Sequence, residues 1–328
     1  MSTQHSRTLI NHNRGRRSAA AGSAAGKRKR SALDDTTTRT LVSSATLNRR
    51  RGRILYWIVA TLVIVGFTMI FLGPLYFMFT DGLKSTKESV QSPPTLYPHA
   101  VHPGNYVDAW SKTGIARLLG NTLYYAFGAL AFQLVFDVAA AYAISKLRPR
   151  FGNAVFGLML ATLMIPALVL VVPQYLTVAD VPVIHLNLIG SPAAIWLPSV
   201  ANGFSIFLLK RFFDSIPDDL MHAAAIDGAG RFKTLWSIVL PMSRPILAVV
   251  SIFAVTSVWK DFLWPKLVEG GFSPTRETLN VGLTQAANTS PQNMVIAASA
   301  IAAVPAIIFF LVFQRNIMAG LTVGSLKG

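Results

Sequence analysis

The chain of 328 residues contains no cysteine, so disulfide bonds and thiolate chemistry are excluded, and a metal site would need other ligands. Charged residues are also scarce, at 13% of the sequence, which is roughly half the fraction found in soluble domains. Acidic residues are the rarer sign, with 14 Asp and Glu against 30 Lys and Arg. Because 52% of the residues are hydrophobic, the composition indicates an integral membrane protein.

The chain also lacks the sequence features of a nucleotide-binding or metal-dependent enzyme. It has no Gly-x-x-x-x-Gly-Lys-Ser/Thr loop, which is the motif that holds ATP phosphates. His99 and His102 form a close pair of imidazoles, but prolines flank them and no third ligand is near in sequence. We therefore predict no cofactor and no metal site.

Nearly half of the basic residues lie ahead of the first apolar run. Residues 1–53 hold 13 Lys and Arg against two acidic residues, Asp34 and Asp35. This segment is poor in apolar side chains, so we predict a disordered cytoplasmic tail that is attracted to anionic membrane lipid. A regulatory role for the tail is a second possibility, whereas nucleic-acid binding is not needed to explain the charge.

Apolar runs long enough to cross a bilayer predict six transmembrane helices. They lie near residues 54–79, 119–144, 153–173, 193–213, 246–265 and 293–313. Residues 80–117 contain several prolines and are predicted to form an irregular outer loop. If the N-terminus is inside, 23 of the 30 Lys and Arg are cytoplasmic or near that side, as the positive-inside rule requires. We therefore predict an all-α, multi-pass protein with both termini in the cytoplasm.

Two polar residues within the predicted spans are candidates for a solute pathway. A carboxylate such as Asp137 costs about 2.5–3.5 kcal/mol at the bilayer centre, so we expect it to reach the inner interface or to bond a neighbouring span. Asn202 is the better candidate for lining a polar pathway. Small residues at Gly120, Gly128 and 139–143 predict close helix packing in the second span.

A polar hairpin at residues 215–245 separates the fourth and fifth predicted spans. Ser215 and Asp218 have the spacing of a capping box, so a helix is predicted to begin near residue 216. The triplet Gly228-Ala229-Gly230 is expected to end it, because glycine makes a chain reversal sterically easy. A hairpin held at both ends by spans would move as a rigid body.

The second half of this hairpin is predicted to be an amphipathic helix from Phe232 to Val239. Pro241 and Pro245 then indicate a bend into the next apolar span.

The sequence from Ala223 to Gly228, followed by Ile238-Val239-Leu240-Pro241, resembles the EAA loop of ABC importer permeases. His222 occupies the position where that family usually has glutamate, and Asp218 and Asp219 lie one turn earlier. The resemblance implies a short helix that docks into a groove on an ATP-hydrolysing subunit. It assigns this coupling role to a set of residues: Asp218, Asp219, His222, Ala223, Ala224, Asp227 and Gly228.

Two further stretches carry the same resemblance. Trp259 to Pro265 is similar to a Trp-rich motif of sugar-importer permeases, with Lys260 where an amide is common, and Thr278 to Leu283 is similar to a loop that has proline at the position of Asn280. The last residues, from Gln314 to Gly328, resemble the ending of the maltose-type subfamily. The resemblance implies a loop facing a binding protein (Asn280, Val281, Gly282, Leu283) and a tail contacting the ATPase (Gly320, Lys327, Gly328).

Residues 54–328 are therefore identified as resembling the maltose-system G-type permease, with the type I ABC importer fold. The resemblance implies a sugar importer subunit in the plasma membrane of a prokaryote, and oligosaccharide transport by alternating access. Its implied partners are a second permease in a heterodimer, a dimer of ATP-binding subunits and an extracytoplasmic solute-binding protein. ATP hydrolysis belongs to a separate chain, so this chain is not an enzyme.

Three alternatives remain open at the level of sequence. A secondary transporter would typically show internal repeats and ion-coupling residues at interrupted helices, which the six unrepeated spans do not indicate. A membrane enzyme would need several reactive groups at one depth, yet the six histidines are scattered. An ABC permease for a solute other than a sugar fits the hairpin equally well.

Overall fold

The computed structural model describes residues 50–269 and 275–323, and the chain divides into two units, 1–72 and 73–328. The predicted basic tail lies outside the described residues apart from residues 50–53. Helix α3 (Arg50–Asp81) begins in the first unit, where its apolar side chains are exposed as on a lipid-facing span. Apart from one bridge between Val181 and Leu186, the regular structure described is helical, as predicted.

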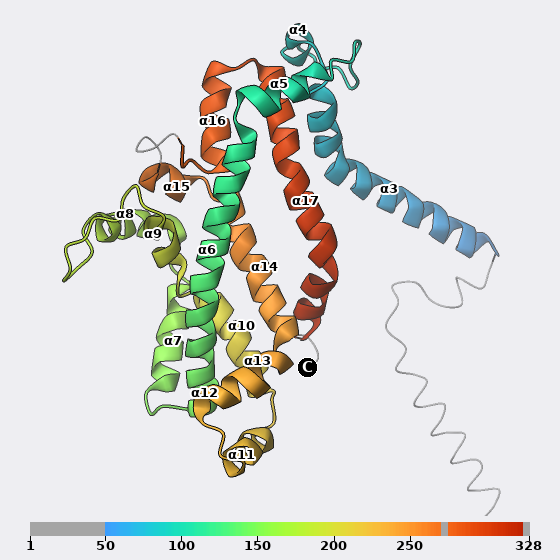
Figure 1. The fold of residues 1–328 in the computed structure, drawn as a ribbon. Helices are drawn as coiled ribbons and strands as arrows, with labels where there is room; N and C mark the ends of the chain where they lie inside the picture. Colours follow the sequence, from blue (N-terminus) through green and yellow to red (C-terminus); the bar gives the residue numbers. More distant parts are fainter. Residues whose placement is uncertain (1–49, 270–274, 324–328) are drawn as a thin grey trace, which may run out of the picture. The chain divides into compact units, whose positions relative to one another are not determined.

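The second unit is built around long helices that run side by side (Figure 1). In chain order, its first helices are α4 (Thr86–Ser89), α5 (Gly104–Lys112), α6 (Ile115–Tyr142), α7 (Gly152–Thr162), α8 (Ala167–Ala179), α9 (Ala193–Trp196) and α10 (Gly203–Asp214). The remaining ones are α11 (Asp218–Ile226), α12 (Arg231–Thr234), α13 (Leu240–Met242), α14 (Arg244–Lys260), α15 (Leu263–Val268), α16 (Leu279–Thr289) and α17 (Gln292–Val323). Short π-helical or 3₁₀ turns at Ala143–Leu147, Leu197–Ser199 and Leu235–Val239 extend α6, α9 and α12.

Three predicted spans are unbroken helices, the third and fourth are bent, and the fifth covers most of α14 and the start of α15. The unbroken spans are Arg51–Asp81, Ile115–Leu147 and Gln292–Arg315. The third predicted span turns by 108° between α7 and α8, and the fourth by 46° between α9 and α10. The break before α8 coincides with Pro166, which lacks the amide hydrogen of a helix interior. The predicted fifth span is too long, because α14 ends at Lys260 and a separate helix, α15, follows.

The prediction of an irregular loop over 80–117 is wrong, because this segment contains α4 and α5 and a buried polar network. Lys84 and Asp81 form a fully buried ion pair with an Nζ–Oδ1 distance of 2.8 Å. Lys84 also donates a hydrogen bond of 2.6 Å to the Thr95 carbonyl, and Ser89 donates one of 2.7 Å to Asp81. Paired charges of this kind tolerate burial that unpaired ones do not, and here they order the segment.

Three apolar clusters stack along the second unit. The first cluster lies at the end that carries α5 and α16, and it joins these helices to α6 and α17. The middle cluster joins α6, α8, α9, α14 and α15. The third cluster lies near the hairpin and joins α6, α10 and α14. Helices α6 and α14 contribute to more than one cluster and form the axis on which the shorter helices are mounted.

The prediction of close helix packing is confirmed at Gly128 and is wrong at Gly120. A Cβ atom on Gly128 would overlap the indole ring of Trp196, whereas one on Gly120 would meet open space. The missing side chain at Gly128 therefore lets α9 lie against α6, with Trp196 stacked on Phe132 at a ring separation of 5.8 Å.

Candidate functional site

The first helix of the hairpin begins two residues later than predicted, and the predicted capping box is wrong. Helix α11 starts at Asp218, and Pro217 precedes it with no side-chain cap. Ser215 instead closes the end of α10, where its hydroxyl donates to the Phe212 carbonyl at 2.6 Å. The Asp218 carboxylate is unavailable to the Ser215 backbone because two basic side chains bind it.

Lys146 and Arg148, from the turn between α6 and α7, anchor the first turn of α11. The Lys146 ammonium donates to the Ile216 carbonyl at 2.6 Å and to Asp218 Oδ1 at 2.8 Å, while Arg148 donates to Asp218 Oδ2 at 2.9 Å. The Lys146 side chain is 3% exposed, against 66% for Arg148, so the two contacts differ in their access to water. Lys146 is therefore expected to be the stronger part of this anchor.

The pKa of the Asp218 carboxyl is lowered from 3.8, first by the hydrogen bond from Lys146 and its charge, and then by Arg148. A depressed pKa in the folded state means that the carboxylate contributes stability above its unfolded pKa. That contribution is lost only as the pH falls from about the ordinary value through the lowered one. The anchor is thus fully formed at neutral pH.

Removing the buried member of this anchor should loosen the hairpin. We expect Lys146→Met to raise hydrogen exchange of the amides in residues 218–226 by about tenfold, because a hydrogen bond to a charged group is worth roughly 1.5–3 kcal/mol. Arg148→Met is the matched control and should change exchange by less than about threefold, since an exposed ion pair contributes little. Equal effects of the two variants would contradict the anchor.

The turn and the second half of the hairpin agree with the sequence prediction. Gly228 adopts a left-handed conformation with φ of +73°, and the Ala229 amide donates to the Ala224 carbonyl at 2.8 Å. Helices α12 and α13 then form one helical segment with the intervening π turn. An 83° bend separates this segment from α14, at the position that Pro241 and Pro245 indicate.

The hairpin lies at the end of the second unit opposite to α5 and α16 (Figure 1). Several of its apolar side chains are exposed. Ile226 is 87% exposed, Phe232 89% and Trp236 75%, and Leu220 is also exposed. We call these four residues the hairpin patch. The predicted coupling residues Asp219, His222, Ala223, Asp227 and Gly228 are exposed beside it, whereas Ala224 is buried. Large apolar side chains exposed together on one short hairpin make it a candidate interaction surface.

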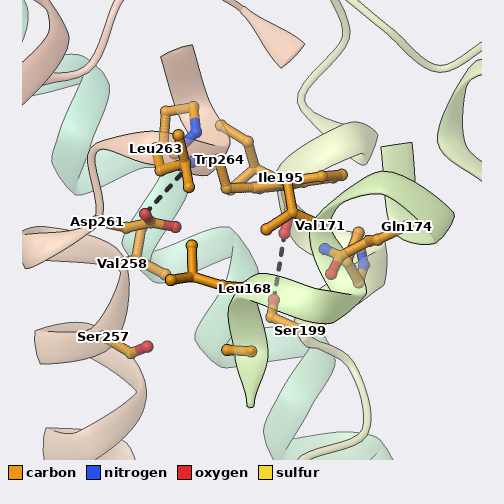
Figure 2. A pocket seen from close by; sticks show the side chains of 13 residues that line it. Leu168, Val171, Gln174, Ile195, Ser199, Ser257, Val258, Asp261, Leu263 and Trp264 are labelled. Atoms are coloured by element: carbon orange, nitrogen blue, oxygen red, sulfur yellow. Dashed lines mark hydrogen bonds between the residues drawn. The ribbon is translucent and has the colours of Figure 1, made fainter. Parts of the chain in front are cut away.

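A second candidate site is a cavity of about 290 Å³ between α8, α9, α14 and α15. Figure 2 shows its polar side chains, Gln174, Ser199, Ser257 and Asp261, among apolar ones such as Leu168, Ile195 and Trp264. The Trp264 indole donates to the Ala194 carbonyl at 2.9 Å and so joins α15 to α9 across one wall. Apolar walls with a few polar groups are typical of small-molecule sites, whose volumes start at roughly 300 Å³.

The predicted binding-protein-facing residues lie in α16 and mostly point inward. Val281 and Gly282 are buried against the second unit, where a Cβ on Gly282 would overlap Leu118. Asn280, at the position that resembled a family proline, donates from its amide to the carbonyls of Trp259 at 3.0 Å and Asp261 at 3.2 Å. Leu283 is half-buried, and the exposed positions of this helix are Thr284, Gln285, Ala287, Asn288 and Thr289.

The two predicted pathway residues lie in contact at the break before α10. The fully buried Asp137 accepts a hydrogen bond of 3.0 Å from the Asn202 backbone amide, which is the interspan bond that the sequence left as one possibility. The Asn202 side chain accepts from Ser205 at 3.0 Å and so caps α10. Neither residue lines the 290 Å³ cavity, so a pathway role for them stays a prediction.

Two other sets of predicted residues are placed as follows. Gly320 lies within the last turns of α17, and Lys327 and Gly328 lie outside the described residues. His99 hydrogen-bonds to Glu88 at 2.8 Å rather than pairing with His102. Within residues 50–269 and 275–323, no group of three His, Asp or Glu has the arrangement of a metal site.

Sequence reasoning missed Lys146 as an anchor and missed the four polar residues of the cavity as a group. In the sequence, Lys146 was interpreted only as one of the basic residues on the cytoplasmic side. It lies 72 residues from Asp218, so no local pattern indicated that the two side chains are in contact. Gln174 and Asp261 were each visible as polar residues near the ends of apolar runs. Only the bend after α7 brings them to one cavity.

Comparison with known proteins places the chain in a family. Residues 133–322 match the family described as the binding-protein-dependent transport system inner membrane component. The chain belongs to this family. It is a permease of a binding-protein-dependent transport system, which agrees with the identification made from the hairpin.

Individual relatives of this permease cover most of its length. It is 31% identical to the sulfoquinovosyl glycerol transport system permease protein SmoH of Agrobacterium fabrum, over 84% of this chain and 95% of that protein. It is 28% identical to the melibiose/raffinose/stachyose import permease protein MelC of Bacillus subtilis, over 78% of this chain and 91% of that one.

A solved structure shares the fold of this permease. It is a bacterial ABC transporter involved in the import of the acidic polysaccharide alginate, with a TM-score of 0.70 at 24% identity. The match covers 81% of this chain and 98% of the matched chain.

Proposed function

We propose that this permease is the membrane subunit of an ATP-driven sugar importer and that it receives motion from an ATPase through residues 215–245. The observation that carries the proposal is the anchored hairpin with its exposed patch. Ile226, Phe232 and Trp236 leave most of their apolar surface in water in the isolated chain, so a partner that covers them gains the hydrophobic free energy of their burial.

The hairpin is attached to the membrane helices at both ends, which lets it transmit displacement. One end is fixed by Lys146 and Asp218 to the turn after α6, and the other continues through α13 into α14. Movement of a docked ATPase would therefore reach α6 and α14, the two helices that carry the apolar clusters. Asp219, His222, Ala223, Asp227 and Gly228 are proposed to contact the ATPase, with Ala224 packed beneath them.

A sugar is the solute class that the relatives and the cavity support. SmoH and MelC are named for solutes that carry several hydroxyl groups. The cavity offers amide, hydroxyl and carboxylate groups beside the Trp264 ring, and such groups hold hydroxyls while the aromatic face covers apolar sugar carbons. Its volume suits part of a solute, so a second permease subunit is proposed to complete the pathway in a heterodimer.

The remaining partners follow from the same arrangement. We propose that an extracytoplasmic binding protein meets the exposed side of α16, and that residues Asn280 to Leu283 support this surface from beneath. A dimer of ATP-binding subunits is proposed at the opposite, cytoplasmic end, with Gly320, Lys327 and Gly328 near it. Both termini are then cytoplasmic in a prokaryotic plasma membrane.

Capture and transport by the same protein test this function. The full chain, purified with its partners, should bring down a second permease and an ATPase, and in proteoliposomes it should take up sugar only with ATP and the binding protein. Ile226→Asp combined with Phe232→Asp should reduce ATPase capture at least tenfold, since two apolar contacts lose roughly 1.5–3 kcal/mol each.

The control for this variant is Val107→Asp, an exposed apolar position on α5 at the other end of the unit. It should leave ATPase capture unchanged. Sugar uptake driven by an ion gradient after ATP depletion would overturn the proposal and favour a secondary transporter.

A further inference from the structure

The 290 Å³ cavity has an uneven distribution of charge. Among its described lining residues, Asp261 is the one ionisable side chain, and no Lys or Arg side chain reaches the wall. The other polar groups, from Gln174, Ser199 and Ser257, are neutral. A solute in this cavity would therefore meet one negative charge with no basic residue of the lining to offset it.

The position of the Asp261 carboxylate is fixed by its backbone and by hydrogen bonds from the backbone amides of Phe262, Leu263 and Trp264. The Asp261 carbonyl accepts from the Asn280 amide at 3.2 Å, and its Oδ1 atom accepts from the Trp264 backbone amide at 3.4 Å. Figure 2 shows the other carboxylate oxygen on the side of the cavity, toward Ile195. The carboxylate is thus held at the wall, with one of its oxygens on the side of the cavity.

Nearby lysines do not cancel this charge within the cavity. Lys260 and Lys266 flank Asp261 in sequence, but both are exposed and neither lines the wall. The Lys266 ammonium lies over the Phe262 ring at 5.0 Å from its centroid instead. Their charges are screened by solvent, whereas a charge inside a partly enclosed cavity is screened much less.

We propose that Asp261 selects neutral or cationic sugars and excludes anionic ones, and that it is a specificity-determining residue of this permease. Sugar hydroxyls donate hydrogen bonds to a carboxylate, and an ammonium group adds an ion pair. A phosphate, sulfonate or carboxylate on the solute would instead be repelled by a like charge at short distance. This inference rests on the proposed function, because it assigns the solute class of that transport pathway.

The family does not decide this point by itself. SmoH is named for sulfoquinovosyl glycerol, whose sulfonate is anionic, and the structural relative for an acidic polysaccharide, whereas MelC is named for melibiose, raffinose and stachyose, which carry no charge. Relatives of both kinds share the fold. The charge of the cavity is therefore the feature that places this chain with the importers of uncharged sugars.

The test compares three sugars that share one ring but differ in charge: one is neutral, one cationic and one anionic. The complete transporter, co-purified with its partner subunits and placed in nanodiscs without a binding protein, is titrated with glucose, glucosamine and glucose 6-phosphate, and the Kd of each is measured by calorimetry. We expect glucose 6-phosphate to bind at least about tenfold more weakly than glucose, a factor equal to about 1.4 kcal/mol. Glucosamine should bind at least as tightly as glucose.

Substitution then isolates the charge from the shape of the site. Asp261→Asn keeps a side-chain oxygen that can accept the Trp264 hydrogen bond and should bring the three Kd values to within about threefold of one another. Ser257→Ala should weaken all three sugars by a similar factor. Thr256→Ala, at the position next to Ser257 in α14 but not among the residues that line the cavity, should change none of them.

Two results would overturn the inference: equal Kd values for glucose and glucose 6-phosphate in the unaltered protein, or a preference that survives in Asp261→Asn. If none of the three sugars binds, the cavity is not a sugar site and the inference also fails. The import function is judged separately, by ATP-dependent uptake with the binding protein present. A failure of one proposal is therefore distinguishable from a failure of the other.

Discussion

Ala224→Pro is expected to abolish sugar uptake while the transporter remains assembled enough to hydrolyse ATP at its basal rate. Ala224 is buried in the interior of α11, and proline there removes a helical hydrogen bond and costs about 3 kcal/mol of helix stability. A broken α11 cannot pass the movement of a docked ATPase to α6 and α14. The measurement is uptake and ATP hydrolysis by the same proteoliposomes, with and without sugar-loaded binding protein.

A graded control separates helix breakage from general damage. Ala225→Gly, at an exposed position of the same helix, costs only about 1 kcal/mol and should keep most of the sugar-dependent stimulation of ATP hydrolysis. Normal stimulation in Ala224→Pro would show that α11 does not couple the two activities. Loss of all protein from the membrane would be detected by immunoblot, and milder Ala224→Gly would then replace it.

Lys84→Met is expected to destabilise the protein more than any other substitution considered in residues 80–117. Among the described residues, the Asp81 carboxylate then keeps the Ser89 hydroxyl as its one side-chain partner, and an unpaired buried charge costs about 3–5 kcal/mol. Denaturant unfolding of the detergent-solubilised protein measures this change. The double variant Asp81→Asn with Lys84→Met should recover part of the loss, since no charge then remains buried.

The exposed ion pair between Lys112 and Asp108 provides the matched control for this substitution. The two pairs have similar lengths, 2.9 Å and 2.8 Å, but the side chains of Lys112 and Asp108 are 61% and 50% exposed. Lys112→Met should therefore cost at most about 1 kcal/mol. Equal destabilisation by Lys84→Met and Lys112→Met would mean that burial of the outer pair does not govern its strength.

The fold features that sequence predicted best depend on local chemistry. Apolar runs located the unbroken spans, the glycine triplet ended α11, and two prolines marked the bend into α14. These signals act over a few residues, through the length of an apolar run or the backbone freedom of one residue type. The family resemblance of the hairpin rested on the same short stretch and agrees with the match over residues 133–322.

The features that sequence missed depend on contacts between distant segments. The local spacing of Ser215 and Asp218 favoured a capping box, but Lys146 binds Asp218 from 72 residues away and competes successfully for its carboxylate. Hydrophobicity made residues 153–173 one span, although the chain turns sharply before α8. The sequence of residues 80–117 predicted an irregular loop, because the structure of this segment depends on the contacts of Lys84 and Asp81 rather than on helix propensity.

The side chain of Asn280 links α16 to the backbone at the 290 Å³ cavity, and this connection has a thermodynamic consequence. Because one amide bonds the carbonyls of both Trp259 and Asp261, a shift of α16 changes the backbone that positions the cavity carboxylate. If docking on α16 changes the affinity of the cavity for sugar by some factor, sugar must change the affinity of docking by the same factor. The affinity of α16 for a docked partner would then differ between the sugar-bound and the sugar-free cavity.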